Sequence, residues 1–365
     1  MKKILLSLAA VAMLAACSKE ETLVQQAPEA IGFDNAFVEN STRSVETPGY
    51  STTNLFNDFA VYGFVEGASL FNGVRVAKGI TNDKLASDWK YEGTQYWITG
   101  ANYDFYAVAP FFAENNYWRI ADNATKTDAG TTITFTNTDG TQDLLYSGIV
   151  EKQGAESNNG AVAFTFKHIL SKVKFSFVNG YNASAATICV RDIKITNAYA
   201  TGEAVLAKDN AETTDVDEAI AWDNFGGDID IAFGNATTVA DYKTYVAPAN
   251  GTTGNLANFD YAYNTTVESY YERFLIPATQ ELHISFVVDL LVSGQKIATY
   301  DHTAKANLAL QPGKSYDIAA TINASNIDPN HAQEPIEFTA TMTDWSTAND
   351  ATATVDTIQQ GTENN

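Results

Sequence analysis

The chain has 365 residues, of which 44 are acidic and 22 basic, and its formal net charge at pH 7 is −22. A surface this negative repels phosphate backbones and argues against nucleic-acid binding. With 45% hydrophobic and 12% aromatic residues the chain is not disordered throughout, and its length allows two domains, each with its own core.

The chain begins like a secretory leader. Lys2 and Lys3 give a positive start, and residues 4–16 are apolar apart from Ser7. This apolar run is too short to span a bilayer.

Two small residues and a cysteine close the leader. Ala15 and Ala16 precede Cys17, which resembles a lipoprotein signal in which the cysteine sulfur is acylated and residues 1–16 are removed. Two or more acyl chains on one residue give a lasting membrane anchor. The alternative is ordinary secretory cleavage beside an incidental cysteine. If Cys17 is acylated, Cys189 has no partner and the protein folds without disulfides.

The residues after the cysteine are charged. Ser18 and Lys19 precede Glu20 and Glu21, although anionic lipid surfaces attract basic residues rather than carboxylates. The cluster resembles the signal that exports Bacteroidales lipoproteins to the outer face of the outer membrane. A solvated linker is the alternative.

Period-two alternation dominates the rest of the chain, as half-buried strands require. Three runs predict the core residues Val173, Phe175, Phe177, Leu282, Ile284, Phe286, Val288, Leu290, Ile336, Phe338, Ala340 and Met342. The residues predicted to point outward include Lys172, Lys174, Ser176, Glu337, Thr339, Thr341 and Thr343. Turn chemistry recurs at Asp139-Gly140, Asn179-Gly180 and Pro312-Gly313. No amphipathic helix exceeds two turns, so we predict an all-β protein with two antiparallel sandwiches.

Two aromatic stretches allow two roles. Residues 96–112 and 116–118, the second stretch being Asn116, Tyr117 and Trp118, are rich in rings that are able to stack on sugars. Alternation of Tyr103, Phe105, Ala107 and Ala109 favours a core strand instead.

Two polar stretches interrupt the strand pattern. Residues 151–161, "EKQGAESNNGA", separate two strand-rich halves and predict a domain boundary. Residues 208–230 contain Asp215, Asp217, Glu218, Asp223, Asp228 and Asp230. Such carboxylates are able to bind calcium, but they do not form a known calcium-binding motif, and a solvated loop is favoured over a metal site.

The sequence contains no catalytic motif. The histidines His168, His283, His302 and His331 are scattered, and none has the spacing of a zinc site or a nucleophile pair. His168 and His283 lie in strand patterns and are predicted to be hydrogen-bonded structural residues. No nucleophile elbow, phosphate-binding loop or dinucleotide fingerprint occurs. We expect neither an enzyme nor a cofactor; a surface hydrolase has only the abundant carboxylates in its favour.

Five motifs follow the leader in order over most of the chain. They are "YDFYAVAP" (103–110), "QDLLYSG" (142–148), "FKHILSKVKFSF" (166–177), and "LALQPGKSYDIAATIN" (308–323) closing with "MTDW" (342–345). Together with the leader they resemble the fimbrillin-like proteins of Bacteroidales. The resemblance implies two transthyretin-like (Greek-key) β-sandwich domains, at 44–155 and 156–345, and a structural subunit of surface fimbriae that serves adhesion.

The resemblance also implies a route of assembly. A lipoprotein precursor, anchored to the extracellular face of the outer membrane by acyl chains such as palmitate on Cys17, loses its N-terminal strand to an arginine-specific protease. The vacated groove then accepts a strand from another fimbrial subunit. Because donor and acceptor surfaces differ, the contact is head to tail and grows an open filament, either as a stalk or with tip and accessory subunits.

The sequence offers one cleavage site for this route. Arg43 is the only basic residue between Lys19 and Arg75, and it lies in a polar stretch that ends in Pro48-Gly49 and is expected to be exposed. We predict cleavage between Arg43 and Ser44. The alternative is a stray surface arginine in a linker.

Residues 17–43 would then form a propeptide. Within it Ile31 and Phe33 have the spacing of a strand that shares one face, consistent with a removable strand.

The C-terminal tail, residues 346–365, is a possible donor strand. Its candidate groove-filling side chains are Ala351, Ala353, Val355 and Ile358. Alanine burial contributes little at about 25 cal/mol per Å², and a frayed tail is the alternative. For the whole protein, the alternative to a fimbrial subunit is a monomeric surface lipoprotein that binds glycans.

Overall fold

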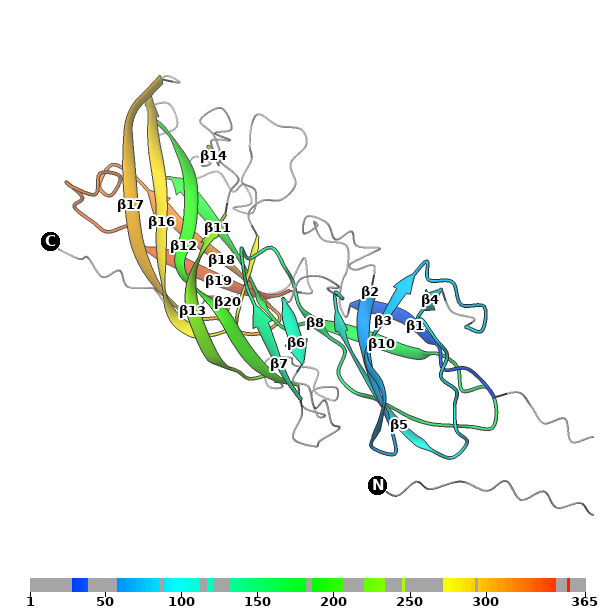
Figure 1. Ribbon diagram of the computed structural model, residues 1–365. Helices are drawn as coiled ribbons and strands as arrows, with labels where there is room; N and C mark the ends of the chain where they lie inside the picture. The colour runs from blue at the N-terminus through cyan, green and yellow to red at the C-terminus, as the bar shows by residue number, and fades with distance from the viewer. Residues whose placement is uncertain are drawn as a thin grey trace, which may run out of the picture.

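The computed structural model describes residues 28–38, 58–85, 88–111, 117–120, 131–181, 186–206, 220–233, 245–246, 272–292, 295–345 and 353–354. Every regular element within these ranges is a β-strand (Figure 1), which confirms the predicted all-β class. None of these residues belongs to a helix with the length and apolarity needed to cross a membrane.

Eight strands form a sheet that closes on itself. They are β1 (Phe33–Val38), β2 (Asp58–Val65), β3 (Ala68–Lys78), β4 (Trp89–Lys90), β5 (Asn102–Ala109), β8 (Leu145–Tyr146), β9 (Val150–Gln153) and β10 (Val162–His168). Their order is β2-β3-β4-β1-β10-β8-β5-β9, and β2 also pairs with β5. The closed ring surrounds a core rich in aromatic rings, among them Phe33, Phe59, Phe71, Trp97, Phe105, Phe164 and Phe166. The alternate β5 residues Tyr103, Phe105, Ala107 and Ala109 are buried in it, which confirms their predicted core role.

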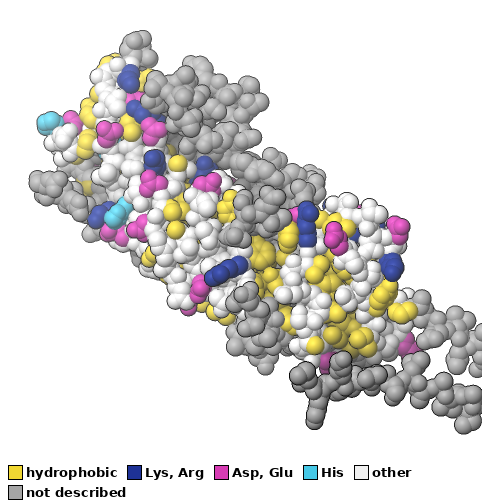
Figure 2. Space-filling model, viewed as in Figure 1, with side chains coloured by type: hydrophobic (Ala, Val, Ile, Leu, Met, Phe, Trp, Pro, Cys, Tyr) yellow, Lys and Arg dark blue, Asp and Glu magenta, His cyan; other side chains and the backbone are white. Residues whose placement is uncertain are grey.

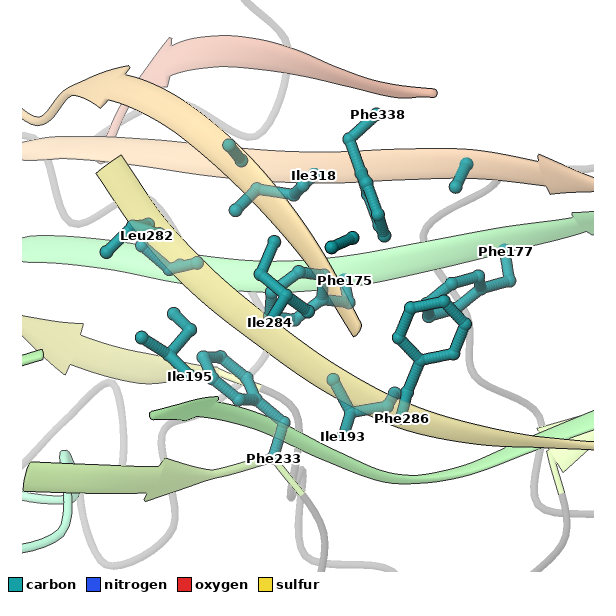
Figure 3. Close-up of a cluster of buried hydrophobic side chains, with 14 of the residues drawn as sticks. Phe175, Phe177, Ile193, Ile195, Phe233, Leu282, Ile284, Phe286, Ile318 and Phe338 are labelled. Atoms are coloured by element: carbon teal, nitrogen blue, oxygen red, sulfur yellow. The ribbon is translucent and has the colours of Figure 1, made fainter. Parts of the chain in front are cut away.

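The other strands form two sheets that pack face to face. The five-stranded sheet has the order β15 (Arg273–Leu275), β11 (Ser171–Asn179), β18 (Lys314–Ile322), β19 (Phe338–Asp344) and β20 (Ala353–Thr354). The seven-stranded sheet follows the path β17 (Gln295–Ala309), β16 (Thr279–Val292), β12 (Thr187–Leu206), β7 (Thr131–Thr136) and β6 (Trp118–Ile120), while β13 (Trp222–Ala232) and β14 (Tyr245–Val246) also pair with β12. Their second core includes Phe175, Phe177, Ile195, Phe233, Ile284, Phe286, Ile318 and Phe338 (Figure 3).

The strands around this second core follow the predicted alternation, with one correction. The predicted core residues are buried, apart from Leu290 and Met342, which are half-buried against it. Ser176 was predicted to point to solvent, but it is buried, and its hydroxyl donates a 2.6 Å hydrogen bond to Asp317 Oδ1 on β18. The alternation shows which face a side chain takes, whereas its burial there depends on a neighbouring strand that is distant in sequence.

Two glycines lie where turn chemistry predicts them. Gly140 and Gly313 have positive φ angles of 73° and 69°, a conformation that glycine adopts without a steric cost. Gly313 follows β17 and precedes β18, so it helps the chain to pass from the seven-stranded to the five-stranded sheet.

Two of the described strand pairings are parallel. β1 runs parallel to β10, and β11 runs parallel to β18. The other described pairings are antiparallel. Parallel neighbours need long connections, and in both cases other strands of the fold lie between the two partners in the chain.

The acidic region predicted to be a loop contains a strand. Residues 222–232 form β13, in which Asp228 pairs with Tyr199 and Ile231 with Ile195 on β12. Ile231 is buried, whereas Asp223, Asp228 and Asp230 are exposed. Charged residues are common on exposed edge strands, and here they conceal the strand signal. Asp215, Asp217 and Glu218 lie outside the described residues.

A third apolar cluster joins the eight-stranded sheet to the other two sheets. Its members include Tyr62, Tyr106 and Tyr146 on one side and Ile133, Phe135, Leu206 and Phe274 on the other. We call the eight-stranded sheet one lobe of the molecule and the two packed sheets the other lobe. Figure 2 shows apolar side chains at the surface between the two lobes, and acidic side chains dispersed over the visible face.

Strand pairing crosses the predicted domain boundary in both directions. β6 and β7 precede residue 155 but pair within the seven-stranded sheet, and β10 follows it but pairs within the eight-stranded sheet. The division into folding units at 44–155 and 156–345 stays a prediction.

Candidate functional site

The segment 28–38 occupies a slot in the eight-stranded sheet. β1 lies between β10 and β4, with Phe33 opposite Val162 on one side and Trp89 on the other. Its parallel register with β10 continues to Val38 opposite Phe166 and shifts between Asp34 and Phe37. β1 is therefore an inner strand, and both of its edges are paired at Phe33.

The backbone just before β1 is also hydrogen-bonded on both sides. The Ile31 N–H donates to the Gln95 carbonyl (2.8 Å), and the Trp97 N–H donates to the Glu29 carbonyl (2.9 Å). On the other side the Val162 N–H donates to the Gly32 carbonyl (2.8 Å). Main-chain bonds of this kind accept any strand with a suitable register, because every residue except proline supplies the same groups.

Two side chains of the segment enter the aromatic core. Ile31 and Phe33 are both 0% exposed, and they share the inner face as their spacing predicts. The Phe33 ring has its centroid 5.4–6.1 Å from the ring centroids of Phe71, Tyr91, Phe105 and Phe164. The Tyr91 hydroxyl donates to the Ile31 carbonyl (2.9 Å), and burial raises the pKa of Tyr91. Removing this segment would uncover an apolar groove lined by aromatic rings.

A polar contact holds the start of the segment. Glu29 Oε2 accepts hydrogen bonds from the Asn159 backbone N–H (2.9 Å) and from Asn159 Nδ2 (2.8 Å). These bonds, led by that of the Asn159 backbone, lower the pKa of Glu29. Asn159 belongs to the loop between β9 and β10, so the polar contact lies beside the strand that borders β1.

Most residues predicted for processing and donation lie outside the described residues. These are Cys17, Arg43, Ser44, Ala351, Val355 and Ile358. Ala353 is described in β20, where it pairs with Met342 on β19 at the margin of the five-stranded sheet.

The histidines take structural positions among the described residues. His168 Nδ1 lies 2.7 Å from Asp143 Oδ2, and its ring stacks on Trp345 with a centroid separation of 3.8 Å. His283 Nε2 lies 3.1 Å from Glu281 Oε1. Both contacts confirm the predicted hydrogen-bonded roles. The described ranges contain no group of three or more His, Cys, Asp or Glu placed to hold a metal ion.

The second aromatic stretch packs against the cluster between the lobes. Tyr117 and Trp118 are half-buried against that cluster, and the indole N–H of Trp118 donates to the Pro110 carbonyl (2.9 Å). Asn116 lies outside the described residues. The hydrogen-bonding group of Trp118 is thus engaged within the protein.

The contact between Glu29 and Asn159 was not predicted from the sequence. Its only local signal is the triplet Asn158-Asn159-Gly160, whose residue types favour turns. The partner is 130 residues away in the chain, and no periodicity connects the two.

Comparison with known proteins identifies the family of this chain and solved structures that are similar to it. A family model described as fimbrillin-like matches residues 42–345. A crystal structure of a fimbrial protein from Bacteroides vulgatus aligns with a TM-score of 0.58 at 18% identity, covering 87% of this chain and 99% of that chain. The structure of a candidate cell adhesion protein from Bacteroides uniformis aligns with a TM-score of 0.45 at 16% identity, covering 87% of this chain and 98% of that chain. No curated protein matches the chain. The family match extends over more than half of the chain, and the protein therefore belongs to the fimbrillin-like family.

Proposed function

We propose that the protein is a structural subunit of cell-surface fimbriae that is cut after Arg43 and polymerises head to tail by strand exchange. The observation that carries the proposal is the position of β1, whose neighbours on both sides are strands of the same ring. Residues 39–57 separate β1 from β2 in the chain and contain Arg43. A cut there would remove the covalent link between β1 and the described strands from β2 onward, which would stay intact.

Loss of the N-terminal segment would favour the entry of a strand from another molecule. Loss of the segment would leave the Val162 N–H and the Gln95 carbonyl without their present partners, and it would expose the rings around Phe33. Unpaired strand edges and exposed apolar surface are both relieved when a strand from another molecule enters.

The C-terminal tail is the proposed donor. Its described residues, Ala353 and Thr354 of β20, pair with Met342 and Thr341 of β19 at the margin of the five-stranded sheet. In a head-to-tail contact this tail enters the groove of the next subunit.

Export and location complete the proposal. Lipidation at Cys17 would hold the precursor at the extracellular face of the outer membrane until cleavage, and the assembled fimbriae would serve adhesion. Membership of the fimbrillin-like family supports a structural, non-enzymatic role at the cell surface with other fimbrial subunits as partners.

The substitution Arg43→Lys tests the cleavage step. An arginine-specific protease should remove the segment ahead of Ser44 from the wild-type precursor and leave the lysine variant intact, because the positive charge is retained while the guanidinium that the protease reads is lost. Mass spectrometry reports the cut, and electron microscopy should reveal fibres only for the wild type.

Two controls complete this experiment. A wild-type chain that lacks residues 346–365 should be cut normally and form no fibres. Fibres from the uncut lysine variant would refute a role for cleavage, and fibres from the tail-deleted chain would refute the tail as donor.

A further inference from the structure

The arginines that follow Arg43 in the chain all lie in described β-strands. They are Arg75 in β3, Arg119 in β6, Arg191 in β12 and Arg273 in β15. A protease cuts exposed, extended segments, so a paired strand must open locally before it is cut. The susceptibility of each arginine therefore depends on how firmly its side chain and its strand are held.

Most of these arginines are held by their side chains as well as by their strands. The Nε acceptors are Asp58 Oδ2 for Arg75 (2.8 Å), Asp289 Oδ2 for Arg191 (2.9 Å) and the Ala232 carbonyl for Arg273 (2.7 Å). β3 pairs with β2 over most of its length, and β12 has partner strands along both edges at this point. Arg273 is buried. Local opening at any of these arginines breaks both side-chain and main-chain contacts.

Arg119 differs from the other arginines of the described strands. β6 consists of residues 118–120, and it is the last strand in the path of the seven-stranded sheet. Its described pairing is with residues 133–135 of β7. The Arg119 side chain is exposed, and it forms no hydrogen bond or ion pair with a described residue. Opening β6 leaves β7 paired with β12 on its other edge.

We propose that the peptide bond between Arg119 and Ile120 is a second cleavage site for an arginine-specific protease. The inference goes beyond the proposed function, because it concerns the body of the chain and holds whether or not Arg43 is cut. Hydrolysis adds one water across the bond and leaves a carboxylate on Arg119 and an amine on Ile120. Because β6 must open first, this cut is slower than the cut at Arg43 and needs a longer exposure to the protease.

The cut would leave the two parts of the chain bound to each other. β5 belongs to the first part, and it pairs with β8 and β9 of the second part. The Phe59 ring of the first part has its centroid 5.8 Å from that of Phe164 and 5.6 Å from that of Phe166, both in the second part. The nicked protein therefore keeps its eight-stranded sheet until it unfolds.

Prolonged digestion of the folded Arg43→Lys chain with an arginine-specific protease tests the site. Intact-mass spectrometry should find first products that end at Arg119 and begin at Ile120. Adding Arg119→Lys should slow the loss of intact chain about tenfold, because the accessible guanidinium is removed. Adding Arg75→Lys is the matched control, since the Arg75 side chain is 51% exposed, and it should change the rate by less than about twofold.

Two further measurements complete the experiment. The same chain unfolded in urea should be cut after every arginine, because the fold and not the local sequence selects Arg119. Gel filtration of the nicked chain in native buffer should give one species with the size of the intact protein.

Several outcomes would overturn the inference. These are a first cut after another arginine, a rate that Arg119→Lys leaves unchanged, and a folded chain that stays uncut. Two separate fragments in gel filtration would show that the nicked chain does not stay together. None of these results depends on fibre formation after cleavage at Arg43, so a failure here is distinct from a failure of the proposed function.

Discussion

At the scale of single residues, one buried histidine beside the second core is expected to respond to pH. His302 is 7% exposed and stacks on Phe286 with a ring-centroid separation of 5.0 Å. Its Nε2 has no hydrogen-bond partner among the residues that the structure describes. Burial lowers the pKa of His302 and outweighs the opposing effects of the Ile327 backbone and of Asp301 and Asp328.

His302 should make the protein less stable in mild acid. Above the ordinary histidine pKa of 6.5 both the folded and the unfolded chain hold it neutral. As pH falls below that value the unfolded chain takes up a proton that the folded chain refuses, so the free energy of unfolding decreases. Urea denaturation from pH 7.5 to 5 should give a shallower pH dependence for His302→Phe, and parallel curves for the two proteins would contradict this account.

At the scale of secondary-structure elements, β1 is a short inner strand whose residue Phe33 is fully buried. Its stability depends on the inward side chains, chiefly Phe33 among the rings of the first core. The neighbouring Asp34 belongs to the same strand but is exposed. Substitutions at Phe33 and at Asp34 therefore distinguish the loss of a buried side chain from a change elsewhere in the strand.

Phe33→Ala should lower the free energy of unfolding of the uncut precursor by about 3–5 kcal/mol, because it removes a fully buried ring. Asp34→Ala should lower it far less, because no buried ring is lost at this exposed position. Denaturant titration measures both. After cleavage at Arg43 the processed chains have identical sequences, so the difference between variant and wild type should vanish. A difference that persisted would mean that the segment had not been released.

Alternation between neighbouring residues predicted much of the fold. The remaining features depend on contacts between residues that are far apart in the chain. Val173, Phe175 and Phe177 were assigned to the core because period two is a property of neighbouring residues. The parallel pairing of β1 with β10 and the contact of Glu29 with Asn159 join parts of the chain that no local pattern relates. β13 was missed because its exposed aspartates resemble those of a solvated loop.

At the scale of the whole molecule, three tyrosines hold the eight-stranded sheet against the other two sheets. The rings of Tyr62 and Tyr106 stack with centroids 5.0 Å apart and an interplanar angle of 10°. Tyr146 lies 6.1 Å from Tyr106, centroid to centroid. Burial raises the pKa of all three hydroxyls, that of Tyr62 to about 12.

The contact between the lobes should weaken in strong alkali. From pH 10, the ordinary tyrosine pKa, to about 12 the unfolded chain loses the Tyr62 proton while the folded chain keeps it, so stability falls as pH rises. Tyr62→Phe keeps the ring and should reduce this loss. Thermal unfolding at pH 8 and pH 11 measures it, and an equal loss in both proteins would exclude the tyrosine as a cause.

The route of the chain between the lobes has a mechanical consequence. The polypeptide leaves the eight-stranded ring after β5, returns to it between β7 and β8, and leaves again between β10 and β11. Tension between the lobes is therefore shared by three covalent connections in parallel instead of being carried by one tether. Each subunit would act as a stiff segment under pulling. The lobes would separate only when strands lose their pairing both in the eight-stranded sheet and in the two packed sheets.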